Sequence, residues 1–480
     1  MDRLRRASLT VLVLASLGVA RPAAAADQQA FLDDLQRRTF DFFWETTPAE
    51  NGLTPDRWPS DSPSSIAAVG FGLTGYLVGV ERGWVDRAAA SERVLATLRF
   101  FHDSPQSDDP QRAAGYRGFY YHFLGQESGL RWRRCELSSI DTALLMMGVL
   151  ACGEYFDADD PREAEIRRLA DTLYRRVEWD WMQPRAPLVA MGWKPEEGGF
   201  GRADYKGYNE AMFLYVLALG SPTHPVEPAA WDAYTSTYDW AEFYGQEHVN
   251  FAPLFGHQYT ACWVDPRGLQ DGYLRARGID YFENSRRATL AQRAYAIANP
   301  AGWRGYGEDF WGLTACDGPA NTELEINGEP RRFHSYWARG ASAERVHDDG
   351  TVAPTAAGGS IPFAPDETLA ALAAMRDRYG DRLYAQYGFR DAINPTFRDG
   401  GVKLSHGVVD PQTGWVADDY LGIDQGPILL MAENHRSGLV WELMKKSPAI
   451  RRGLTRAGFT APWLGAGPPE AAPPTEGESP

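Results

Sequence analysis

The chain has 480 residues and a formal net charge of −16, and its lysines and arginines occur in pairs but never in a long cationic run. This charge balance excludes a nucleic-acid partner, because a polyanion needs a basic surface, and leaves a neutral polymer as a compatible partner. With 44% hydrophobic and 12% aromatic residues and no linker-like tract in its body, the chain predicts one large globular domain.

The first 26 residues, MDRLRRASLTVLVLASLGVARPAAAA, predict a secretory signal peptide. A basic start, a short apolar run over residues 7–20 and an alanine-rich exit form this pattern. The apolar run is too short to span a bilayer. We therefore expect cleavage after Ala26, a periplasmic or secreted protein, and no membrane association after cleavage.

Helical periodicity recurs along most of the remaining chain. Apolar residues three and four positions apart predict helices over residues 31–44, 66–82, 88–104, 138–156, 163–178, 209–220, 228–243, 286–298, 367–378, 427–436 and 438–447. Short connections alternate with long loops rich in glycine and tryptophan, and strand-like alternation is scarce. This pattern favours an all-α fold of paired helices, an (α/α)6 toroid, as a single catalytic domain over residues 27–463. Gly70, Gly72 and Gly75 would permit close helix packing. The tail over residues 464–480, rich in Pro, Glu and Ala, is expected to be disordered.

Aromatic rings are interleaved with carboxylates, amides and arginines over residues 193–319. Such a mixture suits a sugar-binding cleft, because aromatic faces stack on pyranose rings while polar groups read the hydroxyls. The stacking candidates, for several of which a place in the core is the alternative, are Trp193, Phe200, Trp303, Trp311 and Trp337. This stretch predicts a carbohydrate-active protein.

Motifs of other catalytic classes are missing from the sequence. It holds no GxSxG elbow, HExxH, phosphate-binding loop or dinucleotide-binding glycine pattern. The four cysteines have no CxxC or Cys/His spacing, so buried free thiols are expected, with one disulfide as the alternative. We expect no metal and no cofactor, which leaves carboxylate chemistry.

Three carboxylates are the catalytic candidates, because glycosidic hydrolysis needs one acid and one carboxylate. Glu210 lies between the loop GGFGRADYKGYN and the apolar run AMFLYVLALG; its alternative role is to stabilise a helix dipole. Asp141, in CELSSIDTALL, equally fits a capping box with Ser138. Glu136 lies just before that cap, where a structural role is harder to find.

Further residues are candidates for binding sugar hydroxyls or rings. They are Tyr208 and Asn209 beside Glu210, His257 and Gln258 in FGHQY, Glu283 and Arg286 in YFENSRRATL, Trp311, Asp317 in TACDGP, and Asp424 in GIDQGP. Structural alternatives exist: a core histidine for His257, a helix cap for Glu283, a cap followed by Pro427 for Asp424, and a turn for Asp317.

Several runs of this chain resemble the bacterial glucoamylase-like family that contains endo-β-1,2-glucanases, glycoside hydrolase family 144. They are CELSSIDTALL, GYNEAM, PLFGHQY, RGLQDGYLRARGIDYFENSRRATLAQRAY, WGLTACDGP, LGIDQGPI and ENHRSGLVWELM, in the same order over residues 30–460. The resemblance implies an (α/α)6 barrel and metal-free, inverting hydrolysis of β-1,2-glucan. It points to Glu210 and to the acidic group around Asp141 as essential carboxylates.

The resulting hypothesis makes Glu210 the general acid and Asp141 the base, directly or through a water relay, with Glu136 in reserve. The expected enzyme is a monomeric endo-acting glycoside hydrolase. Exo-acting, sophorose-releasing or transglycosylating relatives stay open as alternatives, as do an α-glucan hydrolase, a polysaccharide lyase and a glycan-binding protein without activity.

Overall fold

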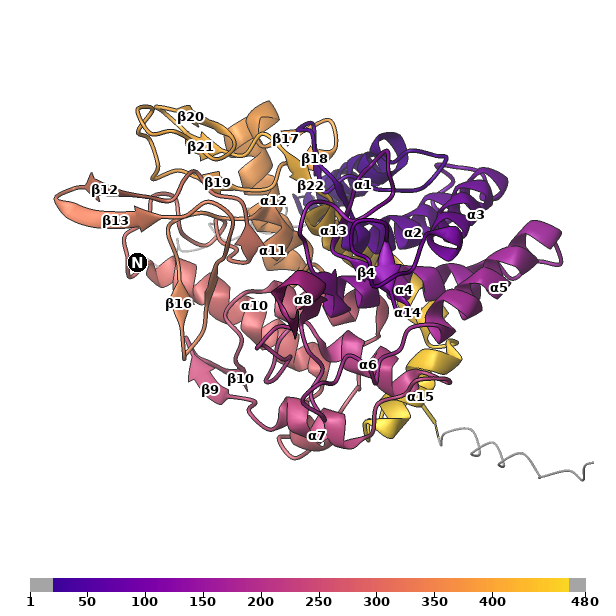
Figure 1. The fold of residues 1–480 in the computed structure, drawn as a ribbon. Coiled ribbons are helices and arrows are strands. Elements are labelled where there is room, and N and C mark those ends of the chain that lie inside the picture. Colours follow the sequence, from indigo (N-terminus) through magenta and orange to yellow (C-terminus); the bar gives the residue numbers. More distant parts are fainter. Residues whose placement is uncertain (1–19, 466–480) are drawn as a thin grey trace, which may run out of the picture.

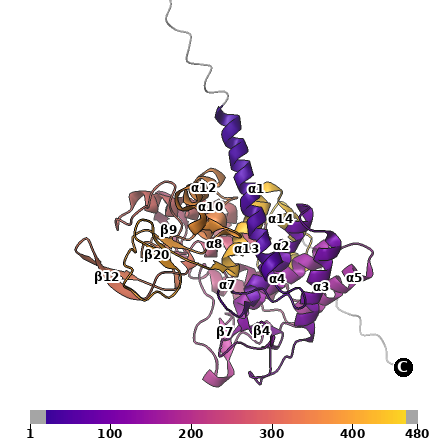
Figure 2. The ribbon, with the colours of Figure 1, turned by 90° about the horizontal axis from the view of Figure 1, so that it is seen from above.

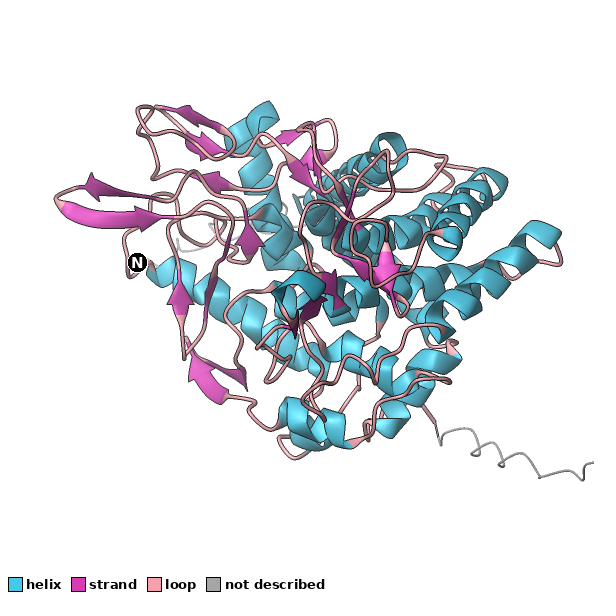
Figure 3. Cartoon of the chain, viewed as in Figure 1, coloured by secondary structure: helices cyan, strands magenta, loops and turns pink. Residues whose placement is uncertain are grey.

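The computed structural model describes residues 20–465, which form a mainly helical body with many short strands (Figure 1 and Figure 3). Most of the expected signal peptide (residues 1–19) and most of the expected tail (residues 466–480) lie outside the described residues. Within residues 20–465, no helix combines the length and apolar character needed to cross a membrane.

The helices agree well with the periodicity in the first half of the chain. They are α1 (Ala20–Thr46), α2 (Ile66–Glu81), α3 (Arg87–Asp103), α4 (Ser139–Tyr155), α5 (Pro161–Arg175), α6 (Met212–Gly220), α7 (Ala229–Thr235), α8 (Phe255–Trp263), α9 (Gly272–Arg275), α10 (Tyr281–Ala298), α11 (Pro354–Gly358), α12 (Pro365–Tyr379), α13 (Gly422–Arg436), α14 (Leu439–Met444) and α15 (Pro448–Arg456). The predicted helices over residues 66–82, 88–104, 138–156 and 163–178 are confirmed to within three residues.

One predicted helix was wrong in its extent, several helices were missed, and one structural alternative does not hold. The helix expected over residues 228–243 ends at Thr235, and its last four residues, 240–243 (WAEF), instead pair with a second strand. Helices α8, α9, α11 and α15 were not predicted. Asp424 does not cap its helix: Leu421 is the N-cap of α13, Asp424 lies in the first turn, and Pro427 lies inside the helix.

The strands are short, lie in the connections between the helices and pair with one another in small sheets. They are β1 (Arg57–Trp58), β2 (Ser64–Ser65), β3 (Gly115–Tyr116), β4 (Phe119–Tyr121), β5 (Phe123–Leu124), β6 (Leu137–Ser138), β7 (Gly192–Lys194), β8 (Gly199–Phe200), β9 (Trp240–Phe243), β10 (Gln246–Val249), β11 (Ala315–Cys316), β12 (Thr322–Ile326), β13 (Glu329–Phe333), β14 (Trp337–Ala338), β15 (Gly340–Ala341), β16 (Val346–His347), β17 (Tyr384–Ala385), β18 (Gly388–Phe389), β19 (Ile393–Asn394), β20 (Val408–Asp410), β21 (Gly414–Val416) and β22 (Tyr420–Leu421). The largest sheet has five strands in the order β3-β4-β6-β7-β8. Figure 1 shows the hairpin β12–β13 extending from the helical body.

Helices α2 and α4 pack closely because glycines lie where they cross. A Cβ atom on Gly70 would lie 2.2 Å from the carbonyl oxygen of Leu144, and one on Gly148 would lie 2.2 Å from the carbonyl oxygen of Gly70. Gly75 likewise faces Leu429 of α13, where a Cβ would come within 2.8 Å of the side chain. The expected close packing around these glycines is confirmed.

Alternate helices are neighbours in space. Helix α2 contacts α4, α4 contacts α6, α6 contacts α8, and α13 contacts both α8 and α2. Helix α11 joins this series, since Gln258 of α8 donates to the carbonyl of Ala356 (2.7 Å) and Thr355 donates to that of Asp424 (2.8 Å). Helices α3 and α5 pack on each other beside α4, and Figure 2 shows the N-terminal end of α1 projecting from the body. The starts of α4, α6 and α13 carry the candidate carboxylates.

Cysteines and large rings fill the interior. Each of the four cysteines is a free thiol, and Cys152, Cys262 and Cys316 are buried, as expected. Trp311 is fully buried and belongs to a core cluster that also contains Phe310. Burial of these side chains stabilises the body that presents the loops at the helix starts.

Candidate active site

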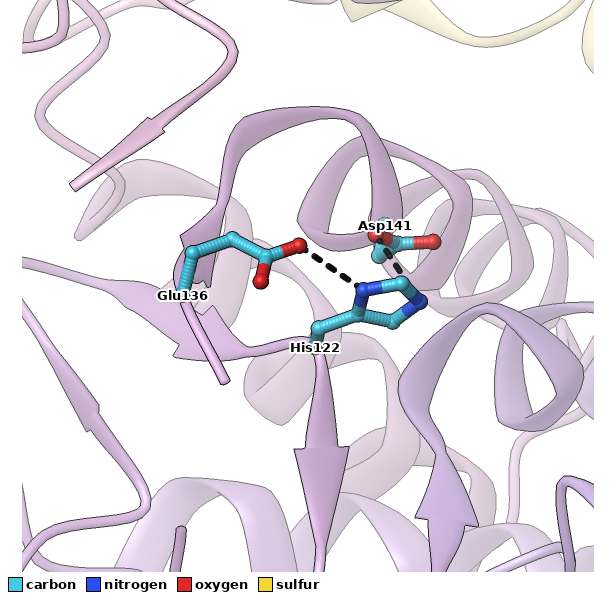
Figure 4. Close-up of side chains that lie close together, drawn as sticks. All are labelled: His122, Glu136 and Asp141. Carbon is cyan, nitrogen blue, oxygen red and sulfur yellow. Dashed lines mark hydrogen bonds and ion pairs between the residues drawn. The ribbon is translucent and has the colours of Figure 1, made fainter. Parts of the chain in front are cut away.

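His122 and Glu136 face each other because of the pairing of strands β4 and β6. Tyr120 pairs with Ser138 and Tyr121 with Leu137 in an antiparallel register. Continuing that register places His122 opposite Glu136, and the backbone N–H of His122 donates to the carbonyl of Glu136 at 2.9 Å. Their side chains meet as a cross-strand pair, with Nδ1 of the imidazole 2.9 Å from Oε1 of the carboxylate (Figure 4).

Asp141 joins this pair from the first turn of α4. Ser138 is the N-cap, its hydroxyl accepting the backbone N–H of Asp141 at 3.2 Å, so the predicted cap is confirmed. The same hydroxyl donates to Oδ2 of Asp141 at 2.5 Å. Nε2 of His122 lies 3.6 Å from that oxygen. The imidazole therefore has a carboxylate at each ring nitrogen.

The charges within this cluster support one another. Burial alone would lower the pKa of His122, but the charge of Asp141 and the hydrogen bond to Glu136 outweigh it and raise the pKa to about 9. The hydrogen bond to His122 in turn lowers the pKa of Glu136 to about 2. At neutral pH the cluster holds an imidazolium next to ionised Glu136.

The cluster lines a cavity of about 480 Å³. Its other walls come from α4 and from the segment over residues 191–205 that contains β7 and β8. They include Ile140, Met191, Lys194, Glu197, Phe200 and Tyr205. Phe200 is half-buried and packs against Trp181 with ring centroids 4.8 Å apart. Trp193 stacks on Tyr116 at 5.4 Å. Two of the five predicted stacking rings thus lie at or beside this cavity.

Glu210 lies in the turn before α6, two residues ahead of Met212. Asn209 holds this turn: its side-chain oxygen accepts the N–H of Ala211 at 2.9 Å, and the Tyr234 hydroxyl donates to its carbonyl at 3.0 Å. Burial raises the pKa of Glu210 to about 7, and the nearby charge of Asp141 adds to the rise. Glu210 is therefore a carboxyl that can keep its proton near neutral pH.

A second group of acids combines Asp317 and Asp424 with Asp391. The Asp317 backbone N–H donates to Oδ2 of Asp391 at 2.6 Å, and Arg57 donates to Oδ2 of Asp317 at 2.9 Å. One carboxylate oxygen of Asp317 is buried without a protein hydrogen bond, and the carboxyls of Asp391 and Asp424 interact with each other. Burial, followed by the charges of Asp317 on Asp391 and of Asp391 on Asp424, raises the pKa of Asp391 and of Asp424. Asp391 and Asp424 are close enough to share a proton.

Tyr259 of α8 connects the two acidic groups. Burial raises its pKa most, and the charges of Asp424 and Glu210 both add to this rise. Its phenol therefore lies within electrostatic reach of both carboxyls. Asp56 makes a second connection, since its pKa is raised by burial and is affected by the charges of His122, Asp317 and Asp141.

The remaining predicted site residues lie in several places. Tyr208 and Asn209 line a neighbouring cavity of about 470 Å³ with Lys206, Phe255 and Arg345. Both are largely buried, and the Tyr208 ring packs on His257 at 4.8 Å. These two residues adjoin Glu210 along the chain but line a different cavity from Asp141.

His257 and Gln258 are occupied within the fold. His257 is 3% exposed, its Nε2 lies 3.2 Å from the carbonyl of Phe251, and burial lowers its pKa to about 3. The Gln258 amide donates to Ala356 and, at 2.7 Å, to the Ser360 hydroxyl. These contacts match the structural alternative, a buried polar residue with internal partners.

Glu283 and Arg286 lie in the first two turns of α10, whose N-cap is Asp280. Glu283 accepts from Arg287 at 2.8 Å and lines a third cavity with Gly268 and Thr460, apart from the Asp141 cavity. Trp303 and Trp311 are core rings, whereas Trp337 is half-exposed and stacks between His334 (4.0 Å) and His347 (4.8 Å).

Sequence reasoning missed His122, Asp391 and Arg57. None of them lies in a helix-start pattern, and His122 is one of nine scattered histidines. A signal existed only for His122: the run GFYYHF followed by CELSS can pair as two strands, which would place His122 opposite Glu136.

Within residues 20–465, one group of side chains brings together atoms that could bind a metal ion. One such atom from each of His122, Glu136 and Asp141 lies within 4.8 Å of the other two. A protonated imidazole has no free lone pair for a cation. A cation would have to displace the imidazole proton before it could bind all three side chains.

Comparisons with known proteins place this chain among carbohydrate-active relatives. A family model described as "Putative glucoamylase" matches residues 202–448. The matched range includes Glu210, Asp317, Asp391 and Asp424, whereas Glu136 and Asp141 lie before it. The crystal structure of a putative glucoamylase from Bacteroides uniformis is similar, with 32% identity and a TM-score of 0.76, over 91% of this chain and 98% of that one. The endo-beta-1,2-glucanase from Chitinophaga pinensis, solved with sophorotriose and glucose, is 26% identical with a TM-score of 0.76, over 91% and 99% of the two chains.

A curated relative is longer than this chain. The exo beta-1,2-glucooligosaccharide sophorohydrolase (non-reducing end) of Parabacteroides distasonis is 28% identical over 463 residues. The match covers 90% of this chain and 58% of that protein. The similarity therefore extends over nearly all of this chain, and the longer relative has additional sequence.

Proposed function

Because this chain belongs to the family described as "Putative glucoamylase", we propose that it is a glycoside hydrolase that cleaves β-1,2-glucan by general acid/base catalysis with carboxylates. The family alone does not specify the linkage. The choice of β-1,2-glucan is supported by the names of two similar proteins, an endo-beta-1,2-glucanase and an exo beta-1,2-glucooligosaccharide sophorohydrolase. The observation that carries the proposal is the raised pKa of Glu210 beside the acidic cavity.

Glu210 is the general acid in this proposal. A proton donor to a glycosidic oxygen must be protonated when substrate binds, and the pKa of about 7 meets this condition near neutral pH. The turn held by Asn209 and Tyr234 gives the carboxyl a fixed place between two cavities. Binding of a sugar would exclude further water and favour the protonated form.

Asp141 is the base, and Glu136 the reserve. Asp141 is close enough to Glu210 for its charge to affect the Glu210 pKa, and it lines the open cavity. Inversion places water between the acid and the base, which requires carboxyl groups about 6.5–9.5 Å apart. Glu136 is ionised but is committed to His122 by its hydrogen bond, so it is the less suitable base.

Asp317 and Asp424 would bind sugar hydroxyls. Asp317 has a buried carboxylate oxygen without a protein partner, and Asp424 forms a carboxyl pair with Asp391, so both positions offer acceptors for hydroxyl donors. Trp58 and Tyr336 are among the exposed large aromatic side chains, at 41% and 53%. Trp58 follows Arg57, which binds Asp317, so its ring could stack on a sugar beside this acid group.

Endo action is the mode that we favour. Two cavities adjoin the loop over residues 205–209, one at Tyr205 and one at Tyr208, and together they could bind sugars on both sides of Glu210.

We also interpret α2, α4, α6, α8, α11 and α13 as the inner ring of an (α/α)6 toroid. Residues 1–26 would direct export, and N-terminal sequencing of the mature protein should start near Asp27.

The test is incubation with linear β-1,2-glucan followed by chromatography of the products. Endo action gives products of intermediate length at early times, whereas release of sophorose alone would show exo action. Glu210→Gln should lose at least about 10²-fold in turnover, while the control Glu227→Gln, whose side chain is 80% exposed, should match the unaltered enzyme. Unsaturated products, starch hydrolysis or binding without turnover would contradict the proposal.

A further inference from the structure

We propose that His122 is a positioning residue: Glu136 holds it across a strand pair so that its positive charge faces Asp141 and fixes that carboxylate beside Glu210. This inference rests on the function proposed above and goes beyond it, since it assigns a role to a residue outside the acid and base. It also gives Glu136 a task other than catalysis.

The geometry fixes the imidazole on three sides. Nδ1 lies 2.9 Å from Glu136, Nε2 lies 3.6 Å from Asp141, and the ring stacks on Phe123 with centroids 3.9 Å apart. The backbone of His122 is held by a hydrogen bond to Glu136 on one strand and by one from Ile66 at the start of α2. A ring held in this way cannot turn away from Asp141 without breaking the pair with Glu136.

Several carboxylates surround His122, and its positive charge compensates theirs. Carboxylates reach His122 from three elements: Glu136 before β6, Asp141 on α4, and Asp56 before β1. Lys194 of β7 acts on Glu136, and Glu210 is the next acid beyond Asp141. Tyr205 also faces Glu210, Asp141 and Glu136, but burial raises its pKa and keeps it neutral.

Loss of the imidazolium would leave these carboxylates facing one another. The negative potential at Glu210, whose pKa is raised by burial and by the charge of Asp141, would then increase. Because Glu210 is the proposed acid, its protonated form, and with it activity, would extend to higher pH.

The main experiment compares pH profiles of kcat/KM on linear β-1,2-glucan between about pH 4.5 and about pH 9. In His122→Gln the alkaline limb should move up by about half a unit, so that the ratio of kcat/KM at about pH 8 to that at about pH 6 rises about threefold. Glu136→Gln removes a negative charge instead and should shift the limb in the opposite direction, whereas His122→Lys should keep the limb close to that of the unaltered enzyme because the positive charge remains. The control His102→Gln alters a partly exposed histidine on α3 and should leave the profile unchanged.

A structural role would give a different result. It would lower kcat/KM by one factor at every pH and leave both limbs in place, and that outcome in folded variants would overturn the proposal. If His122→Gln does not fold, the opposite shift expected for Glu136→Gln decides, because a structural role would leave its limbs in place as well. Activity that depends on an added divalent ion and is lost in His122→Gln would also overturn it, because the cluster would then bind a metal.

A second measurement does not depend on activity. The pKa of His122 lies above its ordinary value in the folded protein, so its stabilising effect is complete below about pH 6.5 and is lost as pH rises through about 9. The difference in free energy of unfolding between the unaltered protein and His122→Gln should therefore shrink over this range. If this difference shrinks but β-1,2-glucan is not cleaved, the charge cluster stands and the proposed function fails.

Discussion

Replacement of Glu210 by glutamine separates catalysis from stability. The substitution keeps the size of the side chain and removes both the proton to be donated and the charge. Raising the pKa of Glu210 from 4.5 to about 7 means that ionisation in the folded protein costs about 3 kcal/mol, as an upper estimate. Glu210→Gln should therefore be inactive and more stable at alkaline pH.

The pH dependence follows from the direction of the shift. The folded protein holds this proton more tightly than the unfolded chain, so the contribution of Glu210 to the free energy of unfolding falls between about pH 4.5 and about pH 7, then levels off. Glu210→Gln removes that fall. Its advantage should be small at about pH 5 and reach up to about 3 kcal/mol at about pH 8.

Two assays on the same preparations test this reasoning. Urea denaturation at both pH values gives the stability difference, and kcat/KM of the unaltered enzyme should fall about tenfold for each pH unit above about 7. Near-normal turnover of Glu210→Gln would refute the acid assignment. An equal stability difference at the two pH values would show that Glu210 has an ordinary pKa and only stabilises the N-terminus of α6.

Further predictions concern packing, charge and metal dependence. Gln258→Ala should lower the free energy of unfolding by about 1–3 kcal/mol, measured by urea denaturation, because buried hydrogen-bond partners lose their donor. Gly70→Ala should cost about 1–3 kcal/mol in the same assay because a Cβ would meet the Leu144 carbonyl at 2.2 Å, whereas the control Gly400→Ala has open space and should be tolerated. Asp391→Asn should be more stable than the unaltered protein at about pH 8 but not at about pH 4, because burial and neighbouring charge raise the pKa of this acid; equal melting temperatures at about pH 8 would contradict this. Activity should survive exhaustive chelation, and a loss restored by one divalent ion would reveal a metal site.

Local patterns in the sequence were enough to predict the helical character and several site positions. Helices α2 to α5 were found because their apolar residues recur at helical spacing over more than three turns. Ser138 and Asp141 were found as a cap because the motif lies within four residues. Glu210 was found because a glycine-rich loop meets an apolar run.

Short helices and strands were missed for a physical reason. Helix α8 has nine residues and includes buried His257 and Gln258, whose partners lie on α11 and in the loop before α8 itself. The strands β9 and β10 are stabilised by each other rather than by local propensity. Long-range pairing of this kind leaves a weak signal in sequence periodicity.

The charge states of the site depended on tertiary structure alone. The sequence by itself determined which carboxylates stand at helix starts, since caps and apolar runs are local. It did not determine that His122 would lie between Glu136 and Asp141, that Asp391 would join Asp424, or that burial would raise the pKa of Glu210. These properties arise when segments far apart in the chain exclude water from the same place, because desolvation and opposing charges act through space.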